Sequence, residues 1–186
     1  MDYDSIYHEN ENYFGNPFPE VLAWFASREV RGRLLDVGCG QGRNAIPLAE
    51  MGYTVHAIDI SHEGISQLRI KNEELGIRME VEERNIWEVT NLSNYNIILL
   101  DGFFHFNPHE LKSDREILNY LITSAAVNTE FVFCFADHAD SIDQFQSLTR
   151  GLLTLESESI FYSYKDPISE WVFETAYALF VLKKVK

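Results

Sequence analysis

Residues 34–61, LLDVGCGQGRNAIPLAEMGYTVHAIDIS, decide the fold. An apolar strand ends in Asp36, and glycines then alternate with other residues before a helix begins, at Gly38, Gly40 and Gly42. Glycines at such a point let the backbone turn tightly and approach a ligand, with amides directed at it from the helix N-terminus. The next strand ends in Asp59, where a carboxylate can accept both hydroxyls of a ribose. The stretch therefore predicts a site for an adenosine-containing cofactor at the carboxyl ends of two strands.

The spacing of these glycines separates two classes of cofactor. Dinucleotide-binding proteins use G-x-G-x-x-G, in which the third glycine permits close packing of the helix. Here the spacing is G-x-G-x-G, and Arg43 stands where the dinucleotide pattern has its third glycine. The negative charge of Asp36 is poorly suited to a pyrophosphate but suits the ammonium and sulfonium groups of S-adenosylmethionine. The residues therefore favour S-adenosylmethionine over a dinucleotide.

Strand and helix signals alternate along the rest of the chain. Apolar or alternating runs predict strands at residues 33–37, 54–59, 78–83, 95–100 and 130–136. Two longer runs, 153–164 and 170–184, are joined by Asp166-Pro167 and predict an antiparallel hairpin. Together they predict an α/β fold with a mostly parallel sheet, helices on both faces, and one domain over residues 1–186.

Capping signals predict where two helices begin and end. Ser61 is expected to cap a helix that ends at Gly76 and has one apolar face, formed by Ile65, Leu68 and Leu75. Ser113 with Glu116 fits a capping box at the start of a later helix.

Composition and charge exclude several classes of function. The formal net charge is −14, from 29 acidic and 15 basic residues, and no basic patch is present, so nucleic acid and anionic membranes are not expected partners. No stretch reaches the ~18 consecutive apolar residues of a membrane-spanning helix. The acidic start, Met1 to Asp4, lacks the features of a secretory signal and predicts a cytoplasmic protein. The expected partner is therefore a small molecule.

The quoted run resembles the first two motifs of class I S-adenosylmethionine-dependent methyltransferases, and GCGQGRN is similar to the loop of tellurite-resistance methyltransferases. The resemblance implies a Rossmann-like seven-stranded sheet in the order 3-2-1-4-5-7-6. It also implies roles for residues at matching positions. Asp36 and the three glycines would surround the methionine moiety, and Asp59 would bind the ribose. Ile60, Asn85 and Ile86 would lie at the adenine, and Asp101 would lie beside the transferable methyl group.

Asp101 and His105 are the candidate catalytic residues, and His138 is a further candidate base, because each is expected near the cleft. Two clusters, His105 with His109 and Glu110, and Asp137 with His138 and Asp140, invite a metal interpretation. Pro108 makes a helical pair of histidine ligands at 105 and 109 doubtful, so no metal site is expected. His56 is interpreted as a packed core residue.

The N-terminal region, residues 1–32, is expected to contain a lid and a helix. Its aromatic residues within 1–16 would cover the cofactor cleft and shelter the sulfonium. The whole pattern predicts methyl transfer to a small molecule. The alternatives are an S-adenosylmethionine-binding regulatory protein without turnover and, on weaker grounds, a nicotinamide-dependent oxidoreductase.

Overall fold

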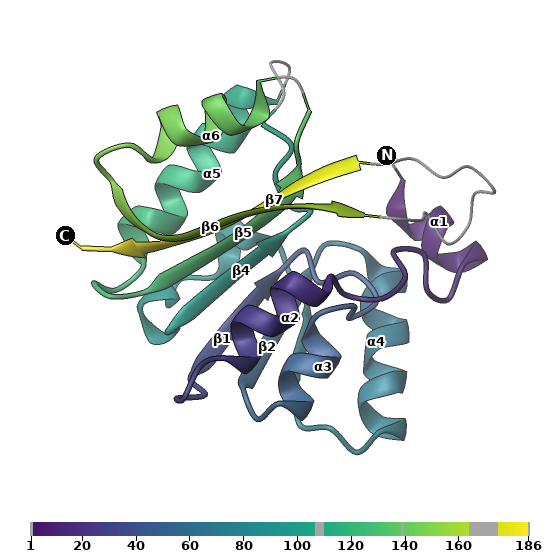
Figure 1. The fold of residues 1–186 in the computed structure, drawn as a ribbon. Helices are drawn as coiled ribbons and strands as arrows, with labels where there is room; N and C mark the ends of the chain where they lie inside the picture. Colours follow the sequence, from purple (N-terminus) through teal and green to yellow (C-terminus); the bar gives the residue numbers. More distant parts are fainter. Residues whose placement is uncertain (1, 107–109, 139, 164–174, 186) are drawn as a thin grey trace.

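The computed structural model describes residues 2–106, 110–138, 140–163 and 175–185, which form a seven-stranded sheet with helices around it (Figure 1). The strands are β1 Arg33–Val37, β2 Thr54–Asp59, β3 Glu80–Glu83, β4 Ile97–Asp101, β5 Glu130–Ala136, β6 Leu153–Ser163 and β7 Thr175–Lys184. Their order is β3-β2-β1-β4-β5-β7-β6. Strands β1 to β5 pair in parallel, and β7 runs antiparallel between β5 and β6. The predicted fold class and strand order are confirmed.

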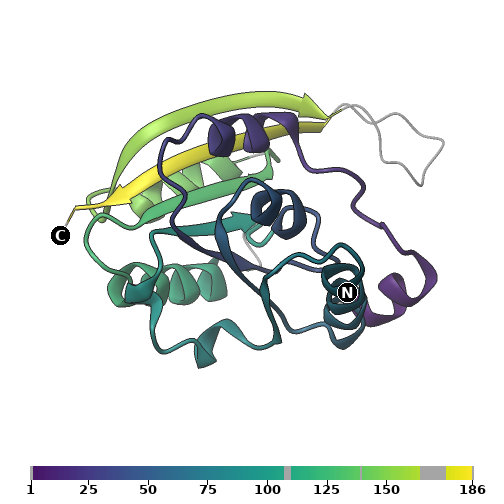
Figure 2. The ribbon, with the colours of Figure 1, turned by 90° about the horizontal axis from the view of Figure 1, so that it is seen from below.

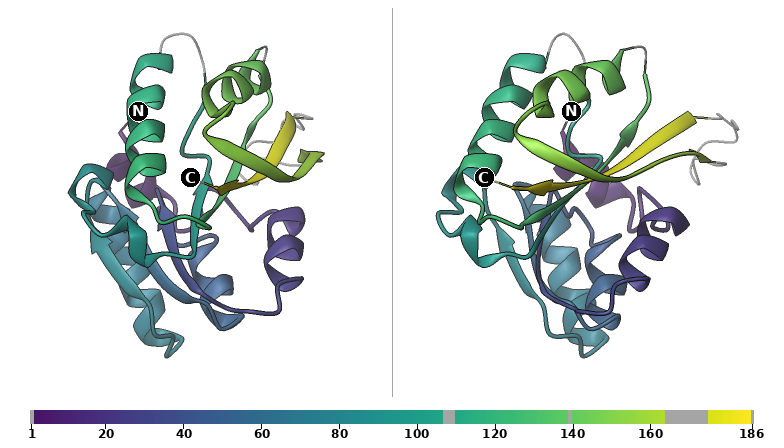
Figure 3. Two further views of the ribbon diagram at one scale, coloured as in Figure 1. Left: turned by 90° about the vertical axis from the view of Figure 1, so that its left-hand side faces the viewer. Right: turned by 60° about the vertical axis from the view of Figure 1, so that its left-hand side comes forward.

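Helices cover both faces of this sheet (Figure 3). Helices α2 Pro19–Ala26, α3 Ala45–Glu50 and α4 His62–Glu74 lie on one face, and α5 Leu111–Ser124 and α6 Ser141–Thr149 lie on the other. Successive strand residues point to opposite faces, so Leu34 enters the core under α2 to α4 while Leu35 enters the core under α5 and α6.

Strand β1 is the point at which the order of the sheet reverses. It pairs with β2 on one side and with β4 on the other. The loops that follow these three strands leave the same edge of the sheet, and ligands of open α/β sheets bind at such a switch point. The N-terminal helix α1, Tyr3–Glu9, lies beside α4 at this edge (Figures 1 and 2).

Some local expectations are confirmed and others are wrong. Ser61 does cap α4, because its Oγ accepts the Gly64 amide at 3.0 Å. Leu75 is 56% exposed instead of buried, because α4 ends at Glu74. Helix α5 begins at Leu111, before Ser113, whose hydroxyl donates to the Glu110 carbonyl at 2.7 Å and forms no capping box.

The connection from β3 to β4 contains no α-helix. Strand β3 covers only Glu80–Glu83, and two 3₁₀ turns, η1 Ile86–Glu88 and η2 Leu92–Asn94, lead from it to β4. The predicted Asp166-Pro167 connection lies outside the described residues. Within the described part of the chain, none of the helices combines the length and apolar character needed to cross a bilayer.

Candidate active site

The loop between β1 and α3 holds its backbone against the neighbouring strand. The amides of Gly38 and Cys39 donate to the Ile58 carbonyl at 2.9 and 3.1 Å. Gly40 has a φ of +50°, and a Cβ there would lie 2.5 Å from the hydroxyl oxygen of Tyr7. Both the backbone angle and the lack of space require glycine at this position.

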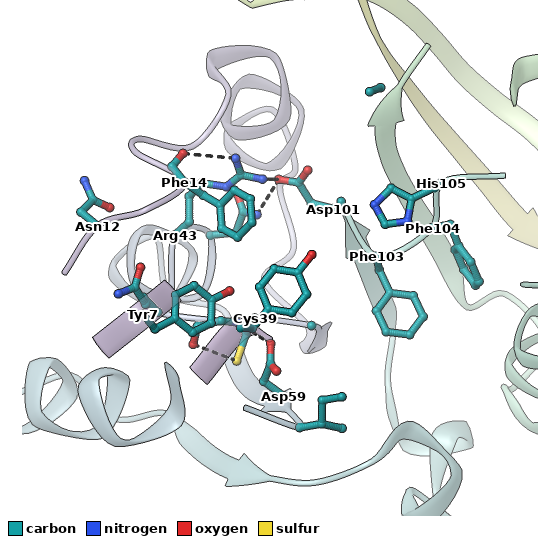
Figure 4. A pocket seen from close by; sticks show the side chains of 18 of the residues that line it. Tyr7, Asn12, Phe14, Cys39, Arg43, Asp59, Asp101, Phe103, Phe104 and His105 are labelled. Carbon is teal, nitrogen blue, oxygen red and sulfur yellow. Dashed lines mark hydrogen bonds and ion pairs between the residues drawn. The ribbon is translucent and has the colours of Figure 1, made fainter. Parts of the chain in front are cut away.

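Asp59 ties this loop to the end of β2. Its Oδ2 accepts the Gly40 amide at 2.8 Å, and its Oδ1 accepts the Ser61 amide at 2.8 Å (Figure 4). Each carboxylate oxygen has a second acceptor position in addition to the one used here. Two acceptors held in fixed positions at the rim of a cavity suit the paired hydroxyls of a ribose.

Asp101, at the end of β4, is braced by two side chains from the glycine loop. Its Oδ2 accepts hydrogen bonds from Arg43 Nη2 at 2.8 Å and from Asn44 Nδ2 at 2.7 Å. The Asp101 side chain is 1% exposed, and that of Arg43 is 17% exposed. Asp101 therefore links the end of β4 to the residues that follow the glycines.

Asp36, at the end of β1, lies beneath this cluster. It is 2% exposed, and its burial, followed by the repulsion of the Asp101 carboxylate, raises its pKa to about 8. Asp36 is therefore mostly protonated at pH 7 in the protein alone. Buried oxygens without a hydrogen-bond partner among the described residues are Asp36 Oδ2, Asn44 Oδ1 and Asp101 Oδ1. Unsatisfied buried acceptors are costly, so this cluster suits a ligand that supplies donors or positive charge.

His105 is positioned by a strained backbone turn after β4. Phe106 has a φ of +50°, which is unfavourable for a bulky residue, and its amide donates to Asp114 Oδ2 at 3.1 Å. The Phe106 ring packs against three buried rings in the core under α5 and α6, those of Phe104, Phe135 and Phe145. His105 Nδ1 lies 3.3 Å from Glu110 Oε2, so the imidazole has a carboxylate partner.

The N-terminal segment lies across the glycine loop. Gln41 bonds it twice: its Nε2 donates to the Asn10 carbonyl, and its Oε1 accepts the Tyr13 amide at 2.9 Å. Asp4 accepts the Ser61 hydroxyl at 2.6 Å. The Arg43 guanidinium lies over the rings of Phe14 and Phe18, at 5.6 and 5.0 Å from their centres. Gln41, between two of the glycines, and Arg43, directly after the last one, thus attach the predicted lid to the predicted cofactor loop.

These elements enclose a cavity of about 350 Å³ (Figure 4). Its walls include, from the predicted site, Gly38, Gly40, Asp59, Ile60, Asp101 and His105. From the N-terminal segment they include Tyr3, Tyr7, Asn12 and Phe14. The structure thus brings the predicted cofactor loop, the ribose acid, one candidate base and the expected lid to one cavity.

Other predicted residues do not line it. Asp36 lies behind the wall, and Gly42 lies against α4, where a Cβ would collide with Leu68. Asn85 is exposed and caps η1 by accepting the Trp87 amide at 3.1 Å, and Ile86 is buried in the second core. His138 is exposed, outside the cavity wall. The adenine contacts of Asn85 and Ile86 remain predictions.

Sequence reasoning missed several residues of the cavity. Arg43 and Asn44 brace Asp101, and Tyr177 and Ala136 extend the wall along β7 and β5. The sequence does mark Arg43 as unusual, because a basic residue stands where the dinucleotide pattern has its third glycine. Tyr177 had none, because only the antiparallel pairing of β7 with β5 brings it to this edge.

Among the described residues, one group has the spacing of a metal site, formed by His56, Glu80 and Glu82. Arg33 and Arg84 already pair with its carboxylates, each at 3.0 Å. The His56 imidazole is 4% exposed, which confirms the interpretation of a packed core residue. In the predicted clusters, His109 lies outside the described residues, and Asp137 accepts the Ser141 hydroxyl at the start of α6.

Comparison with known proteins agrees with this geometry. A family model described as a methyltransferase domain matches residues 34–121, from β1 into α5. The 2-heptyl-1-hydroxyquinolin-4(1H)-one methyltransferase of Mycobacteroides abscessus is 26% identical over 129 residues, 67% of this chain and 55% of that protein. The probable S-adenosyl-L-methionine-dependent methyltransferase TehB of Haemophilus influenzae is 28% identical over 110 residues, 55% of this chain and 38% of that protein. These matches confirm the predicted resemblance to class I S-adenosylmethionine-dependent methyltransferases.

The cofactor of this family is S-adenosylmethionine. The chain spans about half or less of the length of these two curated relatives. A solved structure described as concerning conversion of a disulfide bond into a thioacetal group during echinomycin biosynthesis has the same fold. Its TM-score is 0.78 at 20% identity, covering 100% of this chain and 93% of that one.

The residues of this cavity fit that cofactor. Asp59, at the cavity wall, suits the ribose of an adenosine, whereas the amides of Gly38, Cys39 and Gly40 already donate to Ile58 and Asp59. The unpartnered oxygens of two wall residues, Asn44 Oδ1 and Asp101 Oδ1, suit a cationic, donor-rich group.

Proposed function

We propose that this protein transfers a methyl group from S-adenosylmethionine to a small-molecule acceptor. The observation that supports this most is the single cavity that joins the glycine loop and Asp59 to His105 and Tyr177. One end therefore suits the cofactor, and the other end is left for a second molecule. The relative from Mycobacteroides abscessus is named for a small quinolone acceptor, which supports the same class here.

Asp59, the glycine loop, Asn44 and Asp101 would hold the cofactor. When bound, S-adenosylmethionine supplies a methyl group already activated by a positively charged sulfur. The chain therefore has to orient the acceptor and exclude water, more than to activate the donor.

The N-terminal segment is suited to that second task. Tyr3, Tyr7 and Phe14 line the cavity and contact one another, with ring centres 5.8 to 6.3 Å apart. Rings around a sulfonium both exclude water and favour a positive charge. We infer that residues 2–16 act as a lid over the bound cofactor.

Among the two candidate catalytic residues, only His105 suits proton transfer. Asp101 is buried and bonded to Arg43, so its role is to brace the glycine loop. His105 is exposed at the cavity wall, and Glu110 orients its Nδ1, which leaves Nε2 to accept a proton from the acceptor.

The proposed function is tested by incubating the protein with S-adenosylmethionine and a set of phenol, amine and thiol acceptors. Release of S-adenosylhomocysteine is measured by chromatography, and the methylated product by mass spectrometry. Acceptor-dependent release supports the proposal. Binding of S-adenosylhomocysteine without release for any acceptor would favour the regulatory alternative.

A further inference from the structure

The cavity divides into two halves along the sheet. The half over β1 and β2 contains the glycine loop and Asp59, which suit the cofactor. The other half lies at the ends of β4, β5 and the start of β7, which contribute His105, Ala136 and Tyr177. If the proposed function holds, the acceptor occupies this second half.

The charges in the second half are already paired. Arg43 is the one guanidinium or ammonium side chain among the described residues of the wall, and it donates to Asp101 at 2.8 Å and to the Phe14 carbonyl at 3.5 Å. His105 has Glu110 as its partner. An anionic acceptor would therefore lose its hydration without gaining an unpaired cation from the described residues of the wall, in a chain of net charge −14.

Flat side chains dominate the same half. Tyr177 is stacked on Phe161, with ring centres 5.9 Å apart, and Phe18 packs against both rings. Phe103 and Phe104, which follow β4, also line the cavity, and their rings pack edge to face with centres 5.0 Å apart. Rings from two strand ends in one cavity favour a planar apolar ligand.

We propose that the acceptor is an uncharged molecule with a planar aromatic body and one weakly acidic hydroxyl or amine, not a carboxylate or a metalloid oxyanion. This rests on the proposed function. The paired charges exclude an anion, and the rings hold the aromatic body. A single ionisable hydrogen then faces His105.

The proposal is tested by binding to the protein saturated with S-adenosylhomocysteine. Calorimetry compares 2-naphthol with 6-hydroxy-2-naphthoate, which share a ring system and differ by one carboxylate, and adds selenite as a small oxyanion. We expect 2-naphthol to bind roughly tenfold or more tightly than either anion, because the carboxylate finds no partner. Tyr177→Ala should weaken 2-naphthol binding, and Ile70→Ala, on the exposed surface of α4, should not.

The possible results distinguish failure of the acceptor proposal from failure of the proposed function. Equal or tighter binding of the anions, or no binding of 2-naphthol to the saturated protein, overturns the acceptor proposal. Failure of S-adenosylhomocysteine to bind at all overturns the proposed function instead. Circular dichroism of Tyr177→Ala checks that its loss of binding is not a loss of fold, and Tyr177→Phe should bind 2-naphthol like the parent.

Discussion

The amide of Gly40 donates to Asp59 Oδ2 at 2.8 Å, so the glycine loop after β1 and the acid after β2 form one unit. Gly40 also lies against the Tyr7 hydroxyl. A single residue thus contacts the predicted ribose acid and the N-terminal segment. Changes at Gly40 should therefore affect cofactor binding and the lid together.

Gly40→Ala should weaken S-adenosylhomocysteine binding about tenfold or more, because the new methyl group displaces Tyr7 and shifts the loop. It should also cost about 1–3 kcal/mol of stability through its positive φ. Gly151→Ala is a matched control, since Gly151 has a φ of +77° but open space around it. Calorimetry and chemical denaturation should show a loss of stability in both variants and a loss of binding only at Gly40. Equal binding in the two variants would contradict the role of this contact.

Asp36 should make the free energy of unfolding depend on pH. Its pKa of about 8 in the folded protein exceeds that of an unfolded aspartate, so the folded state holds an extra proton between these values. Its contribution to stability is complete below about pH 4 and is lost as pH rises towards 8, with a slope of at most ~1.4 kcal/mol per pH unit. Asp36→Asn should remove this slope. Denaturation of both proteins from about pH 4.5 to about pH 7.5 measures it, and parallel profiles would show that Asp36 is ionised throughout.

Arg43 and Asp101 should behave as a coupled pair. Arg43→Met leaves the Asp101 carboxylate buried beside Asn44 without its cation and should cost about 2–4 kcal/mol of stability. Adding Asp101→Asn removes the buried charge and should recover part of the loss. A double-mutant cycle by denaturation measures the coupling, and additive effects would mean that the pair contributes nothing specific.

Deleting residues 2–16 should speed the release of S-adenosylhomocysteine, because Gln41 and Arg43 lose their partners in this segment. The sheet should remain folded, since α1 packs chiefly against α4. Stopped-flow release and circular dichroism test both statements. An unchanged release rate would mean that the segment is not a lid.

Local patterns predicted much of this structure. The residues of 34–61 determine a strand, a glycine turn, a helix and a second strand in immediate succession, so their geometry follows from short-range rules. Asp59 could be placed at a strand end for the same reason. The helix start at Leu111 could not, because Glu110 makes no capping hydrogen bond that the sequence would reveal.

Long-range relationships could not be predicted from one sequence. Arg43 and Asp101 are 58 residues apart, and only the pairing of β1 with β4 brings them into contact. The sequence predicts a negative charge at Asp36, but burial raises its pKa to about 8, so this acid is mostly neutral in the protein alone. Glu63 illustrates the same limit: it accepts a hydrogen bond from Gln67, and Gln67 also donates to the Tyr7 carbonyl, a contact 60 residues distant in sequence.

The most direct test of the central claim is the affinity of the Asp59→Ala variant for S-adenosylhomocysteine, measured by calorimetry. Removing both ribose acceptors should cost on the order of 2–4 kcal/mol, or roughly 30- to 1000-fold in affinity, and Asp59→Asn should fall between this variant and the parent. Glu74→Ala, at the exposed far end of α4, is the control and should change binding by less than about 0.5 kcal/mol. If Asp59→Ala binds as tightly as the parent, Asp59 does not hold the ribose of the cofactor.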